Sequence, residues 1–334
     1  MTVRINKPAI NLREELADLR KPSGTAGEAM LRAETPQEQF NLIGAGRRNL
    51  IINGACNISQ RGDFTTASSA SDETYYLDRF EQNLGSVTAN KQHITSNQPS
   101  ALSNTKSWRL TATSTAAGFM GIRQTIEDYK LFNGREFTAS VWVKTNHPSV
   151  RFYIFDGSTT VQGKKTAVAD GEWHYLQETF TFDAASGTKF SIEVISLSEA
   201  GSVTSITTGD YIEFTGFQVE LGKVATPFEH RSYGEELALC QRFYYKTDTI
   251  IHIIAPRYSG SAGDGNAWWK HPVYMRTAPA MSYHGTWYAT SGYGGAPTFG
   301  NNTKDGVALT TSVSTTANGV LYLTGGQISG DAEL

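Results

Sequence analysis

Apolar side chains recur at every second position across most of the region from residue 49 to 229, and turn signals separate these runs. In the clearest run, Phe137, Ala139, Val141 and Val143 occupy alternate positions. A period of two places such a set on one face of a β-strand. The turn signals are pairs that end in glycine: Asn133-Gly134, Asp156-Gly157, Asp170-Gly171 and Ser186-Gly187. Short strands at this spacing, without helices between them, predict a jelly-roll β-sandwich over residues 48–231.

The segment 1–47 differs from the rest in having few aromatic residues and many Arg, Glu, Leu and Ala residues. Leu12, Leu16 and Leu19 lie on one face of a first predicted helix, and Phe40 lies in a second. Helices this short are marginal alone in water. We therefore predict a helical N-terminal arm that docks on its own β-domain, on sister chains or on a separate partner.

A further helix is predicted between the jelly roll and a second, smaller β-domain. Tyr233, Leu237, Cys240 and Tyr244 follow one another at helical spacing and form one apolar stripe within residues 232–246. From residue 247 to 334 the chain is again rich in strand-forming residues, punctuated by Pro and by Asp-Gly and Asn-Gly pairs. The predicted fold class is therefore mainly β, with a jelly roll, a smaller C-terminal β-domain and a short helical arm.

Composition and charge exclude several classes of protein. The net charge is −3, so the chain lacks the surplus of Lys and Arg that a general nucleic-acid binder or a polybasic membrane-surface protein needs. No run approaches the roughly 18 apolar residues of a membrane span. The first seven residues also lack the apolar segment of a signal peptide. Cys56 and Cys240 lie outside any zinc-ligand spacing, which favours two free thiols.

Motifs at both ends of the predicted jelly roll resemble those of tailed-bacteriophage fibre and virion proteins. The opening motif is RNLIING at 48–54, followed by QRG at 60–62 and YLDRF at 76–80. The closing motif is FQVELG at 217–222, ATPFE at 225–229 and RSYGEELALCQRFY at 231–244. Between them, FTASVWVK at 137–144 and DGEWHYLQETFTF at 170–182 are similar to strands of carbohydrate-binding jelly rolls.

Both ends of the chain add to this resemblance. The segment INKPAINLREELADL at 5–19 looks like the start of marine-phage structural proteins, and the final DAEL recurs in such proteins. The resemblance implies a virion location after assembly in the host cytoplasm, with residues 1–47 as the anchor to other tail or capsid proteins. It also implies a homotrimer, for which the sequence shows no coiled coil. Similar jelly rolls often carry a structural calcium ion, for which no ligands are assigned here, and no other cofactor is predicted.

Trp142 is the first candidate for contact with a glycan or another receptor. If Phe137 and Val143 face the core, Trp142 lies on the opposite face of its strand. A flat ring there can stack on the C–H groups of a sugar. The same parity predicts Arg151 and Tyr153 on that face of a neighbouring strand. For Trp142, packing under a loop or against a sister subunit is the alternative.

The positions of the other tryptophans in predicted strands indicate which of them are exposed and which belong to the core. Adjacent residues of a strand point to opposite faces, so at most one of Trp268 and Trp269 is buried on a one-sided sheet. We select Trp269 and Trp287 as receptor-contact candidates, with a subunit interface as an equal alternative. Trp108 and Trp173 are predicted to be core residues.

Catalytic residues are poorly supported by the sequence. A glycosidase needs two carboxylates at a set separation, whereas Asp156, Asp170 and Asp210 fall in predicted turns. No GxSxG motif is present. We therefore predict that the chain is not an enzyme but a trimeric phage fibre protein that binds a host-surface glycan or another receptor. A capsid- or tail-decorating structural protein is the alternative, and a carbohydrate-active enzyme or its binding module is the third.

Overall fold

The computed structural model describes residues 48–127, 129–132, 134–155, 160–181, 189–247, 251–257, 263–289, 296–313 and 319–334. The chain divides into two compact units, Met1–Arg48 and Asn49–Leu334. The elements described here belong to the second unit. The predicted arm, with its anchor candidates Leu12, Leu16, Leu19 and Phe40, lies outside the described residues.

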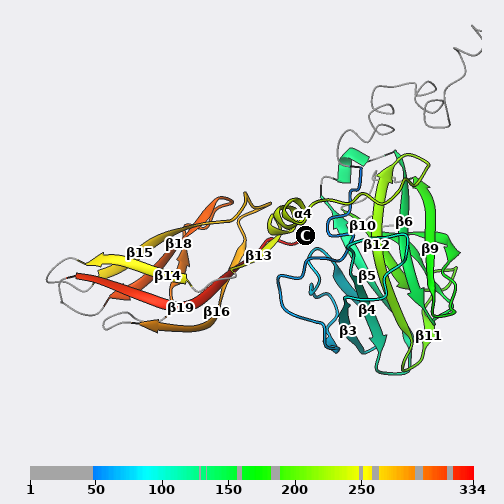
Figure 1. Ribbon diagram of the computed structural model, residues 1–334, viewed down its shortest axis with the longest axis horizontal. Helices are drawn as coiled ribbons and strands as arrows, with labels where there is room; N and C mark the ends of the chain where they lie inside the picture. The colour runs from blue at the N-terminus through cyan, green and yellow to red at the C-terminus, as the bar shows by residue number, and fades with distance from the viewer. Residues whose placement is uncertain are drawn as a thin grey trace, which may run out of the picture. The chain divides into compact units, whose positions relative to one another are not determined.

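Two antiparallel sheets form the sandwich that the alternation predicts (Figure 1). The first, here called the β6 sheet, has in spatial order β1 (Ser68–Ala70), β3 (Ala89–Ile94), β4 (Ser107–Ala112), β12 (Tyr211–Leu221), β6 (Glu136–Thr145) and β9 (Trp173–Thr181). The second, the β5 sheet, has β11 (Thr204–Ile206), β5 (Ala116–Ile126), β10 (Phe190–Ser196), β7 (Val150–Phe155) and β8 (Thr160–Thr166), and β2 (Glu81–Gly85) also pairs with β5. A 3-10 turn, η1 (Tyr129–Phe132), follows β5. The mainly β, jelly-roll fold class is confirmed for the described residues.

Side chains from both sheets fill one core. On β6, the residues at alternate positions from Phe137 to Val143 are all buried, as the sequence predicts. Phe152 of β7 and Phe217 of β12 meet across the sandwich with ring centroids 5.9 Å apart. Trp108 is fully buried, which confirms its assignment to the core. Burying one large apolar side chain contributes about 1.5–3 kcal/mol, so this core dominates the stability of the sandwich.

The helix after the sandwich is shorter than predicted. Helix α4 spans Tyr233–Gln241, and Ser232 and Glu235 form a capping box at its start. The predicted apolar stripe is wrong at both ends, because Tyr233 is 64 % exposed and Tyr244 belongs to a strand. Cys240 is the stripe residue that is fully buried. Among the described helices, none is long and apolar enough to cross a membrane.

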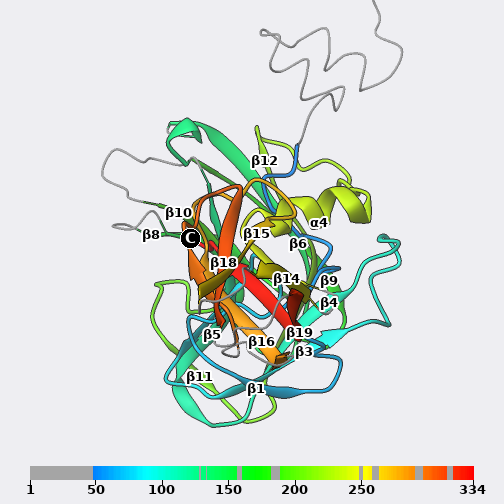
Figure 2. The same cartoon turned by 90° about the vertical axis from the view of Figure 1, so that its left-hand side faces the viewer.

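The C-terminal β-domain contains two further sheets (Figure 2). One consists of β13 (Tyr244–Lys246), β19 (Gly319–Asp331) and β14 (Ile251–Arg257), with β16 (Ala280–Ala289) also paired to β19. The other consists of β15 (Gly263–Lys270), β18 (Gly306–Val313) and β17 (Thr298–Gly300). Tyr245, Met275, Val307, Leu309 and Ile328 belong to its own core cluster. A separate core confirms the smaller β-domain.

Both cysteines are buried free thiols, as predicted. Burial raises the pKa of Cys56 and of Cys240 well above the ordinary thiol value. Since the thiolate is the reactive form, both side chains behave as small apolar residues of the interior.

The closing motif folds back onto the opening motif. The Asn49 side-chain amide donates to the carbonyl of Phe217 at 3.1 Å. Arg231 donates to the carbonyl of Ile51 at 3.0 Å and forms an ion pair with Glu236 at 3.2 Å. These contacts join segments that lie up to 180 positions apart in the chain. The residues that carry the phage resemblance therefore close the sandwich.

The C-terminal residues are joined to the jelly roll by a buried charge network, here called the clasp, formed by Arg61, Asp78, Arg79 and Glu333. Arg79 and Glu333 form an ion pair, and their side chains are only 2 % and 6 % exposed. Arg79 also donates to the carbonyl of Thr125 at 2.8 Å. Arg61 lies 3.5 Å from Glu333 and 3.7 Å from Asp78. Burial raises the pKa of Asp78 to about 7, although Arg61 acts in the opposite direction.

Replacing Glu333 by Ala should lower the free energy of unfolding by about 3–5 kcal/mol, because it leaves Arg79 buried without its counter-charge. Urea unfolding followed by tryptophan fluorescence measures the loss. The exposed Glu199→Ala variant is the matched control and should change stability by less than about 0.5 kcal/mol. Equal, small effects of both substitutions would show that the clasp contributes little.

Candidate functional site

Three aromatic side chains lie on the outer face of the β6 sheet, and we call them the aromatic platform: Trp142, Trp173 and Tyr175. Trp142 lies directly opposite Tyr175 in the pairing of β6 with β9. Their ring centroids are 5.4 Å apart at an interplanar angle of 50°. Tyr175 is 44 % exposed, and Trp142 is half-buried. The prediction that Trp142 points away from the core is confirmed.

Trp173 is not the core residue that the sequence analysis predicts. It pairs with Lys144, which shares the outer face with Trp142, and it is half-buried. Its indole N–H donates to the carbonyl of Asn97 at 2.7 Å. Buried Leu176 on β9 already indicates the correct parity, because residues 173 and 175 must then point outward. The same signal would have identified Tyr175, which the sequence analysis missed.

Polar side chains lie next to the platform, and among them Ser140 and Gln218 are buried. Ser140 lies between Gln218 and Gln177 in the register of β12, β6 and β9. Gln218 is held in place because its amide donates to Glu220 at 2.7 Å. Gln177 and Lys144 are half-buried and reach the surface beside Tyr175. Flat rings flanked by amide and ammonium donors are the chemistry that recognises hydroxyl-bearing ligands.

The loop 95–106 between β3 and β4 covers one side of the platform. Its Leu102 is 9 % exposed and lies close to Gly216 on β12, the strand next to β6. Gly216 has a φ of +62° at a bulge in β12, and a Cβ there would lie 2.6 Å from Leu102 Cδ1 and 3.3 Å from Trp142 Cδ1. The positive φ favours glycine here, and a Cβ would displace the flexible end of Leu102. The loop leaves Tyr175 as the most exposed ring of the platform.

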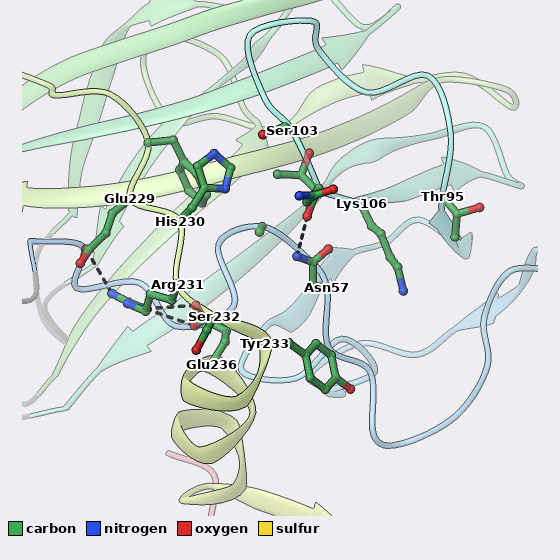
Figure 3. Close-up of a pocket in the computed structure, with 14 residues that line it drawn as sticks. Asn57, Thr95, Ser103, Lys106, Glu229, His230, Arg231, Ser232, Tyr233 and Glu236 are labelled. Carbon is green, nitrogen blue, oxygen red and sulfur yellow. Dashed lines mark hydrogen bonds and ion pairs between the residues drawn. The ribbon is translucent and has the colours of Figure 1, made fainter.

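A pocket of about 790 Å³ is also bordered by loop 95–106 (Figure 3). Residues 55–57, 103–106 and 228–236 supply most of its wall. Figure 3 shows Arg231 beside Glu229 and Glu236, with Asn57 and Lys106 on the other part of the wall. None of the residues that the sequence analysis selected lines this pocket. Its wall comes from segments far apart in the chain, so no local pattern could have indicated it.

Arg151 and Tyr153 do not lie beside Trp142, and this prediction is wrong. They belong to β7, which pairs with β10 and β8 in the other sheet. Arg151 is 5 % exposed and donates to the carbonyl of Gly163 at 3.2 Å. Parity alone assigns a face within a strand, whereas membership of a sheet depends on long-range pairing.

Tyr153 instead lies opposite Glu193 of β10, in a charged row on the outer face of the β5 sheet. Arg123 of β5 forms two hydrogen bonds of 2.8 Å with Glu81 and lies 3.9 Å from Glu193. The Asn83 side-chain amide donates to Glu193 at 2.8 Å. Burial raises the pKa of Glu193 to about 7, against the opposing effect of Arg123. This row is an internal network rather than an open site.

In the C-terminal domain, the exposed tryptophan is Trp268 and not the predicted Trp269. Trp268 is 54 % exposed, whereas Trp269 and Trp287 are partly buried against the core of the domain. The rule that adjacent tryptophans face opposite sides holds, but the wrong member was selected. Tyr274, Tyr283 and Tyr288 are also exposed.

Comparison with known proteins bears on the platform directly. Residues 72–200 match the family model of a carbohydrate binding domain. All three platform residues lie within the segment that matches this model. No curated protein sequence matches the chain. Within the described residues, no cluster of three His, Cys, Asp or Glu side chains could hold a metal ion.

Several solved structures are similar to part of the chain. The enzymatically active domain of tailspike protein 4 from bacteriophage CBA120 is 17 % identical, with 52 % of this chain and 21 % of that one covered and a TM-score of 0.33. TmCBM61 in complex with β-1,4-galactotriose is 11 % identical, with coverages of 53 % and 100 % and a TM-score of 0.29. A CBM4 structure is 14 % identical, with coverages of 51 % and 98 % and a TM-score of 0.32. TM-scores this low do not support an argument about function. The match of residues 72–200 to a carbohydrate binding domain is the finding that does.

The Glu193→Gln variant should change how stability depends on pH. The pKa of Glu193 is about 7 in the folded state, against an ordinary value of 4.5. The protonated side chain therefore stabilises the folded state fully below about pH 4.5. This stabilisation is lost as the pH rises through 7 and the buried side chain must ionise. The free energy of unfolding of the wild type, relative to this variant, should therefore fall by about 3 kcal/mol from pH 4.5 to 8. Urea unfolding across this range measures it.

The exposed Glu199→Gln variant is the control and should follow the wild-type profile. If the free energy of unfolding of Glu193→Gln depends on pH as that of the wild type does, burial does not raise the pKa of Glu193.

Proposed function

We propose that this chain binds glycans through the aromatic platform, as a fibre protein of a tailed-bacteriophage particle. One observation carries the binding function: Trp142, Trp173 and Tyr175 lie together on an outer sheet face, within the segment that matches a carbohydrate binding domain. If Trp142 and Trp173 were buried in the core, no ring of theirs could contact a sugar. The platform joins rings from two neighbouring strands of one rigid sheet.

The platform can recognise a sugar by two kinds of contact. The exposed Tyr175 ring and the accessible part of Trp142 offer apolar faces for the C–H groups of a pyranose. Gln177 and Lys144 stand beside them and can hydrogen-bond to the hydroxyl groups. Both contacts act without bond breaking, so the proposed activity is binding and not catalysis. Rings held by a sheet lose little conformational freedom when the ligand binds.

The proposal of a virion fibre rests on the resemblance of the opening and closing motifs to phage fibre proteins. Residues 1–47 would attach the chain to tail or capsid proteins, and the β-domains would meet a host-surface glycan. As a homotrimer, three weak sites on one particle component would gain avidity through their effective concentration. The expected location is the virion.

A structural role as a capsid- or tail-decorating protein is the second candidate. Trp268, Tyr274, Tyr283 and Tyr288 are exposed on the C-terminal domain, and such side chains are common in contacts between chains. In that role these residues would pack against neighbouring subunits, and glycan binding would not be needed.

Trp142→Ala and Tyr175→Ala should each weaken glycan binding by about tenfold or more, which corresponds to about 1.4 kcal/mol. The full chain would be screened on a glycan array, and affinity for the best glycan would be measured by calorimetry. Tyr274→Ala is the matched control, because Tyr274 is exposed in the other domain. Unchanged affinity in both platform variants, with the fold intact by circular dichroism, would refute this site.

Deleting residues 1–47 should prevent incorporation into particles, because these residues are the proposed anchor. Immuno-electron microscopy with an antibody to residues 247–334 measures both incorporation and position. Label of the full chain at tail or fibre ends supports adhesion, whereas label spread over the capsid supports the decorating role. Incorporation of the truncated chain at the wild-type level would contradict the anchor.

A further inference from the structure

Six of the fourteen residues that line the pocket beside α4 have small uncharged polar side chains, and four are charged. The uncharged polar members are Asn57, Thr95, Ser103, Asn104, Thr105 and Ser232. Its volume of about 790 Å³ lies in the usual range of small-ligand sites. The wall therefore offers many hydrogen-bond donors and acceptors of the kind that pair with hydroxyl groups.

The charged groups of this pocket largely satisfy one another. Arg231 lies 3.2 Å from Glu236 and 3.5 Å from Glu229. Glu229 also accepts from the backbone N–H of Asn49 at 2.6 Å, and Glu236 accepts from that of Asn53 at 2.5 Å. The formal charges of Lys106, Arg231, Glu229 and Glu236 sum to zero, so the pocket has no net charge that would select an anion or a cation. An uncharged ligand fits this balance.

The polar groups of the wall differ in burial and in pairing. The Thr105 hydroxyl is buried, and it has no hydrogen-bond partner among the described residues. The same holds for Nε of Arg231, whose side chain is 7 % exposed. The ammonium of Lys106 forms no ion pair within the described part of the chain. Because the Thr105 and Arg231 atoms are buried, a ligand in the pocket would instead reach the ammonium of Lys106 and the exposed side chains of Ser103 and Asn104.

Aromatic rings border the same space. The Phe228 and His230 rings meet edge to face with centroids 5.0 Å apart. His230 is exposed, and Tyr233 at the start of α4 is 64 % exposed. Ring faces next to small polar side chains are a combination suited to a sugar, whose ring has both apolar and hydroxyl surfaces.

We propose that this pocket is a second saccharide site that takes one uncharged sugar residue, such as the end of a glycan chain. This proposal extends the glycan binding proposed above but uses different residues. Both sites share loop 95–106, since Ser103 and Lys106 line the pocket while the carbonyl of Asn97 accepts a hydrogen bond from Trp173 of the platform. A sugar in the pocket would therefore restrain the loop that covers one side of the platform.

Binding of single sugars to the full chain tests the proposal. The probes are the methyl glycosides of glucose, galactose, mannose and N-acetylglucosamine, with methyl glucuronoside as the charged comparison, and saturation-transfer NMR and titration calorimetry are the readouts. At least one neutral glycoside should bind, and Ser103→Trp should weaken it by at least about tenfold by filling the pocket. Lys106→Met, which removes a donor without adding bulk, should weaken it less.

Ser100→Trp is the matched control, because Ser100 is exposed on the same loop and does not line the pocket. It should bind the neutral glycoside like the wild type. Three results would overturn the proposal: no neutral glycoside binds, the glucuronoside binds better, or Ser103→Trp binds as Ser100→Trp does. Circular dichroism confirms that each variant is folded.

The two sites fail independently in this design. If Trp142→Ala and Tyr175→Ala abolish oligosaccharide binding but Ser103→Trp changes nothing, the platform stands and the pocket proposal falls. If Ser103→Trp alone abolishes binding, the pocket stands and the platform is the wrong site.

Discussion

The buried ion pair between Arg79 and Glu333 joins the C-terminal residues of the described chain to the jelly roll. Both side chains are almost fully buried, so neither charge can lose its partner without a large free-energy cost. Arg79 belongs to the opening motif and Glu333 to the last residues of the chain. Together with Arg61 and Asp78, this pair ties the C-terminal strand to the jelly roll. Arg61, Asp78 and Arg79 of the opening motif are thus explained by closure of the fold.

When the sandwich is closed, the outer face of the β6 sheet carries the aromatic side chains of the proposed glycan site. The pairing of β6 with β9 brings Trp142 next to Tyr175, and Leu102 lies close to the bulge at Gly216. The long β3–β4 loop contacts Trp173 of this platform and also lines the pocket beside α4. Both candidate sites depend on one loop that is held by a buried leucine and by the hydrogen bond from Trp173 to Asn97. The rigid sheets supply the ring positions, and the loop shapes access to them.

Much of the fold could be predicted from the sequence, and less of the candidate site. Alternation on β6 correctly placed Trp142 outside, because the period of two is a local property of the strand. The same reasoning on β9 would have placed Trp173 outside, but its position at the strand start was interpreted as core. Arg151 and Tyr153 were assigned to the wrong neighbourhood, because parity does not reveal which sheet a strand joins. The shortened α4 reflects a cap at Ser232 and the recruitment of Tyr244 into β13.

By itself, the sequence determined the β class, the smaller C-terminal β-domain, the buried face of β6 and the two free buried thiols. These features follow from side-chain alternation, turn residues and residue type, all of which act over a few neighbouring positions. Only the tertiary structure decided that Trp268 and not Trp269 is exposed, that Arg231 pairs with Glu236 beside a pocket, and which rings share the platform. Those outcomes depend on pairing and packing between segments far apart in the chain, and no local pattern carries that information.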